Sequence, residues 1–175
     1  MFESDIDTKD IKIMTILQND ARAPVAEIAR QVGMVPSAVH ARLRKLEEAG
    51  VILGYEPRLE PAALGFGLTA FVFVASDDRP GHLGTADALA LLPEVQEVHH
   101  ITGEDCFLLK VRVRDMDDLS RLMREGIGAV GTVRGTRTTV VFDTVKETMA
   151  LPLEASVEAP RAAAGESGGR RLAGG

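Results

Sequence analysis

The chain has 175 residues, a formal net charge of −6 at pH 7 and one cysteine. Its hydrophobic content of 45% suffices for one or two small cores, but no apolar run is long enough to cross a membrane. The single cysteine excludes an internal disulfide and no export segment is apparent, so we expect a soluble, cytoplasmic protein.

Two short helices are predicted first. Asp7 can cap a helix that starts at Thr8, and a second helix opens at Pro24 and ends at Gly33. Apolar residues recur in both with the 3.6-residue spacing of a helix. In the first helix these are Ile11, Met14, Ile16 and Leu17, and in the second they are Val25, Ile28, Ala29 and Val32.

A third helix is predicted from about Pro36 to Ala49, and only three residues separate it from Val32. Such a short connection containing glycine is typical of a helix-turn-helix, whose final helix enters the DNA major groove. One face of this helix is apolar and the other is polar and basic. The apolar face carries Val39, Leu43 and Leu46, and the candidate DNA contacts are Ser37, His40, Arg42, Arg44 and Lys45. The first two can reach bases or phosphates, and the three cations suit phosphates.

The chain leaves this helix through Gly50, and the extended run that ends at Tyr55 is expected to form a wing. An alternative for residues 1–55 is a three-helix bundle whose basic face is merely solvated. Because the net charge is negative, DNA binding requires a local basic patch, repeated in an oligomer.

These residues resemble the winged helix-turn-helix of the leucine-responsive and AsnC (feast/famine) regulators. The resemblance lies in the opening Ile6-Asp7-Thr8-Lys9-Asp10, in Arg22, and in the ending Leu46-Glu47-Glu48-Ala49-Gly50-Val51-Ile52. It implies a transcriptional regulator that binds double-stranded DNA at an operator. The chain departs from the family at Val35, where the usual serine would cap the recognition helix and contribute about 1 kcal/mol.

Prolines and glycines in residues 56–66 predict a hinge, followed by a second domain at 67–153. Four strands and two helices are predicted there from the spacing of apolar residues. The strands are residues 68–75, 95–101, 107–113 and 137–143, and the helices are residues 83–92 and 116–125. This β-α-β-β-α-β order predicts a ferredoxin-like fold with both helices on one sheet face. The chain is therefore α+β, and the open apolar face predicts a homodimer.

The second half also resembles the feast/famine family, in the turn Thr102-Gly103-Glu104-Asp105-Cys106 and in the final strand Thr136-Arg137-Thr138-Thr139-Val140-Val141-Phe142. The resemblance implies a small amino acid effector bound where dimers meet, with further assembly into tetramers or octamers. The effector-binding candidates are Thr102, Gly103, Asp105, Thr136 and Thr138. Turn amides can receive a carboxylate and Asp105 an ammonium group, although Asp105 can equally bond its own backbone.

No nucleophile is paired with a base, and we expect no catalytic residue, cofactor or metal site. His99 and His100 are adjacent on a strand, so they point to opposite faces and cannot bind one ion together. Two alternatives remain: a siroheme-decarboxylase-like enzyme on the same two-domain frame, and a ligand sensor whose DNA binding is vestigial. Residues 154–175 are expected to form a disordered tail, because they lack apolar periodicity.

Overall fold

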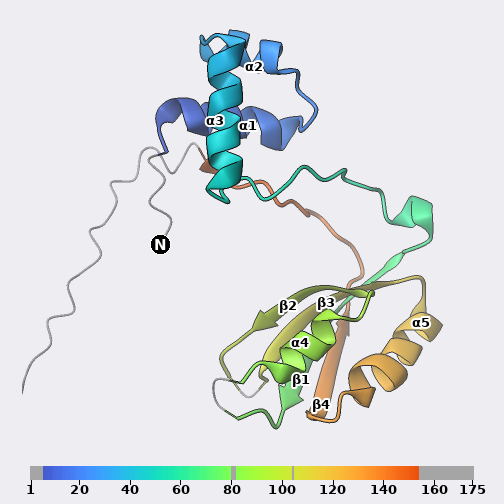
Figure 1. The fold of residues 1–175 in the computed structure, drawn as a ribbon. Coiled ribbons are helices and arrows are strands. Elements are labelled where there is room, and N and C mark those ends of the chain that lie inside the picture. Colours follow the sequence, from blue (N-terminus) through green and yellow to red (C-terminus); the bar gives the residue numbers. More distant parts are fainter. Residues whose placement is uncertain (1–5, 80–81, 104, 154–175) are drawn as a thin grey trace, which may run out of the picture. The chain divides into compact units, whose positions relative to one another are not determined.

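The structure is a computed structural model that describes residues 6–79, 82–103 and 105–153. The tail expected at 154–175 lies outside these residues. The chain forms two units (Figure 1). The first contains the described residues up to Pro57 together with Thr148 to Leu153, and the second spans Arg58–Glu147. Residues 148–153, in the range expected for the second domain, group with the first unit, where the Gln18 side chain of the first helix donates to the Leu151 carbonyl and accepts from the Leu151 N–H.

The first unit contains the three helices expected from the sequence: α1 (Thr8–Asn19), α2 (Val25–Val32) and α3 (Pro36–Glu48). The Asp7 carboxylate caps α1 by accepting hydrogen bonds from the backbone N–H groups of Lys9 and Asp10. Gly33 ends α2 with a φ of +66°, a left-handed conformation that favours glycine. The apolar faces of the three helices meet in one core. Its buried residues are Ile13, Ile28, Ala29, Val32, Val39 and Leu43.

The extended run expected as a wing does not form a strand, since residues 51–60 are irregular. The N–H groups of Val51 and Ile52 turn back to the carbonyl oxygen of Leu46, which closes the end of α3. Among the described residues of this unit, the rest of the run has no neighbouring strand with which to form a ladder.

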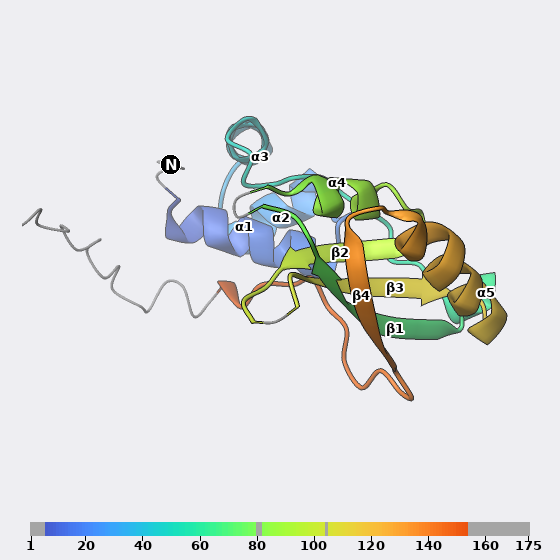
Figure 2. The ribbon, with the colours of Figure 1, turned by 90° about the horizontal axis from the view of Figure 1, so that it is seen from below.

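The second unit contains β1 (Leu68–Ser76), α4 (Gly84–Ala90), β2 (Val95–His100), β3 (Phe107–Val113), α5 (Met116–Arg121) and β4 (Val133–Val140), after a short 3-10 turn at Ala62–Leu64. Its strands form an antiparallel sheet with the order β2-β3-β1-β4. Helix α5 continues into a π turn at Leu122–Gly126 and a 3-10 turn at Ile127–Ala129. Both helices cover one face of the sheet (Figure 2). The ferredoxin-like prediction is confirmed.

The last strand is displaced from the predicted range, residues 137–143. It begins at Val133, which pairs with Ser76, and it ends at Val140, which pairs with Ala70. The length of β1 sets these limits through backbone pairing. The start of β4 contains Gly135 and no alternation of apolar residues, so the sequence pattern gave no sign of it.

The sheet face opposite the helices is half apolar and half charged, not apolar throughout as expected. Phe71, Phe73 and Leu108 form its apolar half. Next to them, Lys110 contacts Glu97 (Nζ–Oε1, 3.2 Å) and also Glu147. Arg112 also binds Glu147, and the side chains of both cations are only 14% exposed. The positive charges on this face are therefore already paired within the chain.

Candidate nucleic-acid interface

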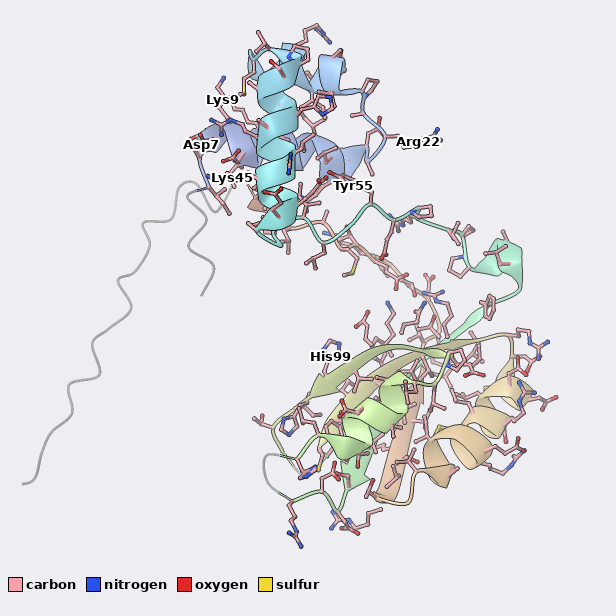
Figure 3. All side chains as sticks on the ribbon, viewed as in Figure 1. Asp7, Lys9, Arg22, Lys45, Tyr55 and His99 are labelled. Carbon is pink, nitrogen blue, oxygen red and sulfur yellow. The ribbon has the colours of Figure 1, made fainter. Side chains whose placement is uncertain are left out.

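The exposed side of α3 gathers four of the five candidate DNA contacts. Val39, Leu43 and Leu46 are buried against the other helices, so the opposite side of α3 faces solvent (Figure 3). The exposed candidates are Ser37, His40, Arg44 and Lys45. They span two turns of one helix, which is the length of helix that the major groove accommodates.

Arg44 holds an ion pair on this surface. Its Nε lies 2.7 Å from Oε1 of Glu48, one turn further along α3, and the two side chains are 81% and 63% exposed. Such an exposed pair contributes little to stability and exchanges readily with another anion. Arg44 is therefore available to a phosphate at small cost.

Arg42 lies elsewhere. Its Nη1 is 2.7 Å from Oδ2 of Asp7 and 2.8 Å from Oδ1 of Asp10, and its side chain is 30% exposed. The Asp10 side chain is buried, at 4% exposed. Hydrogen bonds from the backbone N–H of Asp10 and from Arg42 lower the pKa of Asp7. Arg42 is thus paired with the first turn of α1, whereas the other four candidates are exposed.

The start of α3 lacks a side-chain cap. Val35 occupies the N-cap position, followed by Pro36 at the first helical position, and no side chain accepts a hydrogen bond from the first turn. Ser37 does not compensate for the serine that the family usually has one position before Pro36. The recognition helix therefore begins with one capping interaction fewer than it could have.

Two contacts in this unit were not anticipated from the sequence. The Lys9 ammonium donates a hydrogen bond to the carbonyl oxygen of Val32, at the end of α2. The Tyr55 hydroxyl donates to Oε1 of Glu47 at 2.8 Å, and burial together with this carboxylate raises the pKa of Tyr55 to about 12. Neither pair has the spacing of neighbours within one helix or strand, so the sequence pattern does not indicate these contacts.

The effector candidates lie around the turn between β2 and β3 and on β4. Gly103 has a φ of +121°, and Asp105 binds Nη2 of Arg137 at 3.0 Å. Arg137 shares the open sheet face with Phe73, whose ring centroid lies 3.9 Å from the guanidinium carbon. Among the β4 candidates, Thr138 contacts Met123.

Because side chains alternate along a strand, Thr136 and Thr138 point to the face opposite Arg137. Thr102 and Gly103 are exposed at the turn. The five effector candidates therefore do not form one pocket within a single chain.

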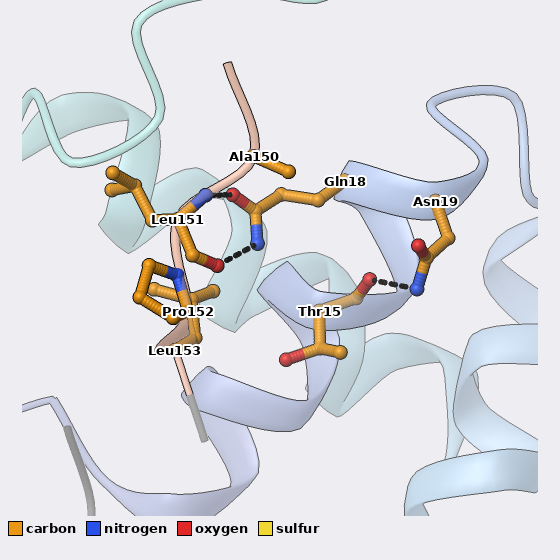
Figure 4. Close-up of a pocket in the computed structure, with 7 residues that line it drawn as sticks. All are labelled: Thr15, Gln18, Asn19, Ala150, Leu151, Pro152 and Leu153. Atoms are coloured by element: carbon orange, nitrogen blue, oxygen red, sulfur yellow. Dashed lines mark hydrogen bonds between the residues drawn. The ribbon is translucent and has the colours of Figure 1, made fainter. Parts of the chain in front are cut away.

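A shallow pocket of the first unit involves none of the candidates (Figure 4). Thr15, Gln18 and Asn19 of α1 line one side of it, and residues 150–153 line the other. The Gln18 side-chain amide donates to the Leu151 carbonyl (3.2 Å) and accepts from the Leu151 N–H (2.6 Å). The pocket therefore lies between α1 and the segment 150–153 of the same chain.

The two adjacent histidines point to opposite faces of β2. Nε2 of His99 lies 2.9 Å from Oε2 of Glu97, and the His100 ring lies 5.4 Å from the Phe107 ring. Within the described ranges, no three His, Cys, Asp or Glu side chains are grouped so that they could hold a metal ion. None of the helices in those ranges is long and apolar enough to span a membrane.

The sequence matches the family model of a winged helix-turn-helix DNA-binding domain over residues 6–52 and that of the Lrp/AsnC ligand binding domain over residues 69–151. The HTH-type transcriptional regulator FL11 of Pyrococcus horikoshii is 38% identical over 150 residues, which cover 85% of this chain and 97% of that protein. The proline dehydrogenase transcriptional activator of Rhizobium radiobacter is 37% identical over 146 residues, 82% of this chain and 94% of that protein.

Solved structures with the same arrangement include a transcriptional regulator from Neisseria meningitidis in complex with L-methionine, with a TM-score of 0.80 and 30% identity over 86% of this chain and 98% of that one. A feast or famine regulatory protein from M. tuberculosis complexed with L-methionine has a TM-score of 0.77 and 32% identity, covering 83% and 98% of the two chains. AsnC of E. coli has a TM-score of 0.77 and 28% identity, covering 83% and 97%.

Proposed function

The chain belongs to the Lrp/AsnC family of DNA-binding transcriptional regulators, and we propose that it reads its operator with the exposed side of α3 and responds to a small amino acid. The observation that carries this proposal is the separation of faces on α3, with apolar residues buried and Ser37, His40, Arg44 and Lys45 exposed. Ser37 and His40 lie in the first turns, where base edges are within reach, whereas Arg44 and Lys45 supply charge to phosphates.

The regulator works as a homodimer that places two copies of α3 on a pseudo-palindromic site. The open face of the sheet supports this, because Phe71, Phe73 and Leu108 form an apolar surface that a second copy can cover. Lys110 and Arg112 beside this surface are both paired with Glu147, so a second copy covering the face would not bury either cation unpaired.

Light scattering tests the dimer. Leu108→Glu places a charge on the apolar half of this face and should yield monomers. The matched control is Leu91→Glu, since Leu91 is 83% exposed and lies at the end of α4, on the other side of the sheet. Equal dimerisation by both variants would exclude the open face as the interface.

An amino acid effector is the second part of the proposal. Two structures similar to this chain are complexes with L-methionine. In this chain the exposed turn at Gly103 offers backbone amides to a carboxylate, and Asp105 can hold an ammonium group. Since one chain does not bring Thr136 and Thr138 to this turn, we place the complete site between copies, where assembly and ligand binding are coupled.

A gel-shift titration tests both parts. DNA from upstream of the chain's own coding region is titrated at two salt concentrations, with and without L-methionine and a pool of the other amino acids. We expect a sequence-specific, salt-dependent shift whose midpoint the amino acids change. A specific shift that no amino acid alters would remove the effector, and the loss of any specific shift would remove this DNA as the operator.

A catalytic role is not part of the proposal. The siroheme-decarboxylase-like alternative depends on histidines in the second unit, and here His99 pairs with Glu97 while His100 packs on Phe107. Retention of a basic exposed side on α3 favours a regulator over either alternative. Mixing the chain with siroheme and recording its absorption spectrum tests the enzyme: an unchanged spectrum is expected.

A further inference from the structure

Arg42 lies where α3 contacts α1, and it is paired there with two carboxylates. With 100° of rotation per residue, it lies about 160° around the helix from both His40 and Arg44, although only about 60° from Lys45. It points instead to the N-terminal turn of α1, where Asp7 and Asp10 receive it. The two carboxylates neutralise the guanidinium charge, so Arg42 attracts a phosphate only weakly.

These three residues form a closed network. Oδ1 of Asp7 accepts hydrogen bonds from the N–H groups of Lys9 and Asp10, and Oδ2 accepts from Arg42. Oδ2 of Asp10 accepts from the N–H of Asp7, and Oδ1 accepts from Arg42. Every carboxylate oxygen is thus engaged, so the guanidinium is held against the start of α1 in one orientation.

The same turn of α1 also holds the other helix of the motif. Lys9, between the two carboxylates in sequence, donates its ammonium hydrogen bond to the last carbonyl of α2, that of Val32. The Lys9 ammonium lies over Gly33, 3.8 Å from where a Cβ of that residue would be. One helical turn therefore contacts the end of α2 and the middle of α3.

We propose that the first turn of α1 sets the angle between α2 and α3 through Lys9, Asp7 and Asp10, and that Arg42 is a positioning residue for DNA recognition and makes no phosphate contact. This inference rests on the proposed use of α3 as the recognition helix. It predicts that acidic residues, which repel DNA, are needed for DNA binding.

The two possible roles of Arg42 predict opposite effects for Asp7→Asn. If Arg42 bound phosphate, removing its acidic partner would free the guanidinium and remove a negative charge, and affinity would rise. If Arg42 positions α3, the same change loosens the helix and affinity falls. Asparagine caps helices as well as aspartate does, so α1 keeps its start. Arg42 keeps its ion pair with Asp10, so the change leaves no buried charge unpaired.

The test uses the full chain and a duplex that the wild-type protein has first selected from a random-sequence pool. A failed selection would contradict the proposed function and not this inference. Fluorescence anisotropy then gives the affinity at several salt concentrations for Asp7→Asn, Arg42→Met and Lys45→Met. Lys45 is the matched control because it is an exposed cation on the same helix.

We expect Asp7→Asn to weaken binding about fivefold, on the scale of a lost, partly exposed ion pair, without changing the salt dependence. Lys45→Met should reduce the slope of log K against log salt by about 0.9 for each copy bound. Arg42→Met should weaken binding and keep the wild-type slope. Unchanged or tighter binding by Asp7→Asn would overturn the inference, as would a slope reduced by Arg42→Met as much as by Lys45→Met. If Arg42→Met does not fold, Asp7→Asn decides alone.

Discussion

The uncapped start of the recognition helix allows a sharp test of how the fold supports DNA binding. Val35 already has an N-cap backbone conformation, with φ −81° and ψ 148°, and its side chain is 62% exposed. Val35→Thr keeps the shape of the side chain and replaces one methyl group with a hydroxyl, which can accept a hydrogen bond from the Ser37 N–H. Because little apolar surface is lost, the cap should contribute about 1 kcal/mol to the free energy of unfolding.

The chain offers its own probe for this change. Its only tyrosine is Tyr55, in the first unit, and it has no tryptophan, so intrinsic fluorescence follows the unfolding of that unit. For a unit of this size the urea dependence is about 1 kcal/mol per M, so 1 kcal/mol raises the urea midpoint by about 1 M.

Val35→Ser should give a similar gain, and Val35→Ala, which adds no acceptor, should give none. A midpoint that stays at the wild-type value in both hydroxyl variants would refute the reasoning, as would an equal gain in the alanine control. Either result would show that the missing cap of α3 does not limit the stability of the first unit.

Three further results are expected. The Tyr55 phenol should titrate near pH 12 by ultraviolet absorbance, and Glu47→Gln should lower that pKa. Because the pKa is higher in the folded state, the stability linked to this group is complete below the unfolded-state pKa of about 10. It is lost as the pH rises toward 12. The pKa of Asp118 is lowered to about 2, chiefly by its hydrogen bond from Arg114. Asp118 should therefore stabilise the second unit above pH 4 and lose that effect as the pH falls toward 2, which carboxyl NMR shifts and acid unfolding can follow. The loss of stability between pH 4 and pH 2 should be smaller in Asp118→Asn than in the wild type, and an equal loss in both would contradict this assignment. Gly33→Ala should lower the urea midpoint seen by tyrosine fluorescence, since alanine in the left-handed region costs about 1 kcal/mol, and an unchanged midpoint would show that α2 can end differently.

The sequence predicted best where one residue carries a local physical rule. Asp7 caps α1 and Gly33 ends α2 because a carboxylate acceptor and a left-handed φ are strictly local requirements. The alternation from Phe107 to Val113 is likewise a local pattern, and the strand has those limits. These features were sufficient to predict the element order and therefore the fold of each unit.

Prediction failed where the structure of a segment depends on a contact with residues far away in the sequence. The limits of β4 depend on β1, to which it pairs, and the run after Gly50 has no pairing strand. Arg42 looked equivalent to Arg44 in sequence, yet α1 supplies acidic partners to only one of them. The effector candidates were assembled by resemblance, and alternation along β4 separates Thr138 from Arg137, the partner of Asp105.

Selection of duplex DNA from a random-sequence pool by the full-length protein tests the central claim most directly. If paired copies of α3 read DNA, successive rounds should enrich a pseudo-palindromic sequence whose half-sites are separated by whole helical turns, about 10 base pairs or a multiple. Lys45→Met should bind that sequence more weakly and with a smaller salt slope. A pool that stays random, or an enriched sequence bound equally well by Lys45→Met at every salt concentration, would contradict the assignment of α3 as the recognition helix.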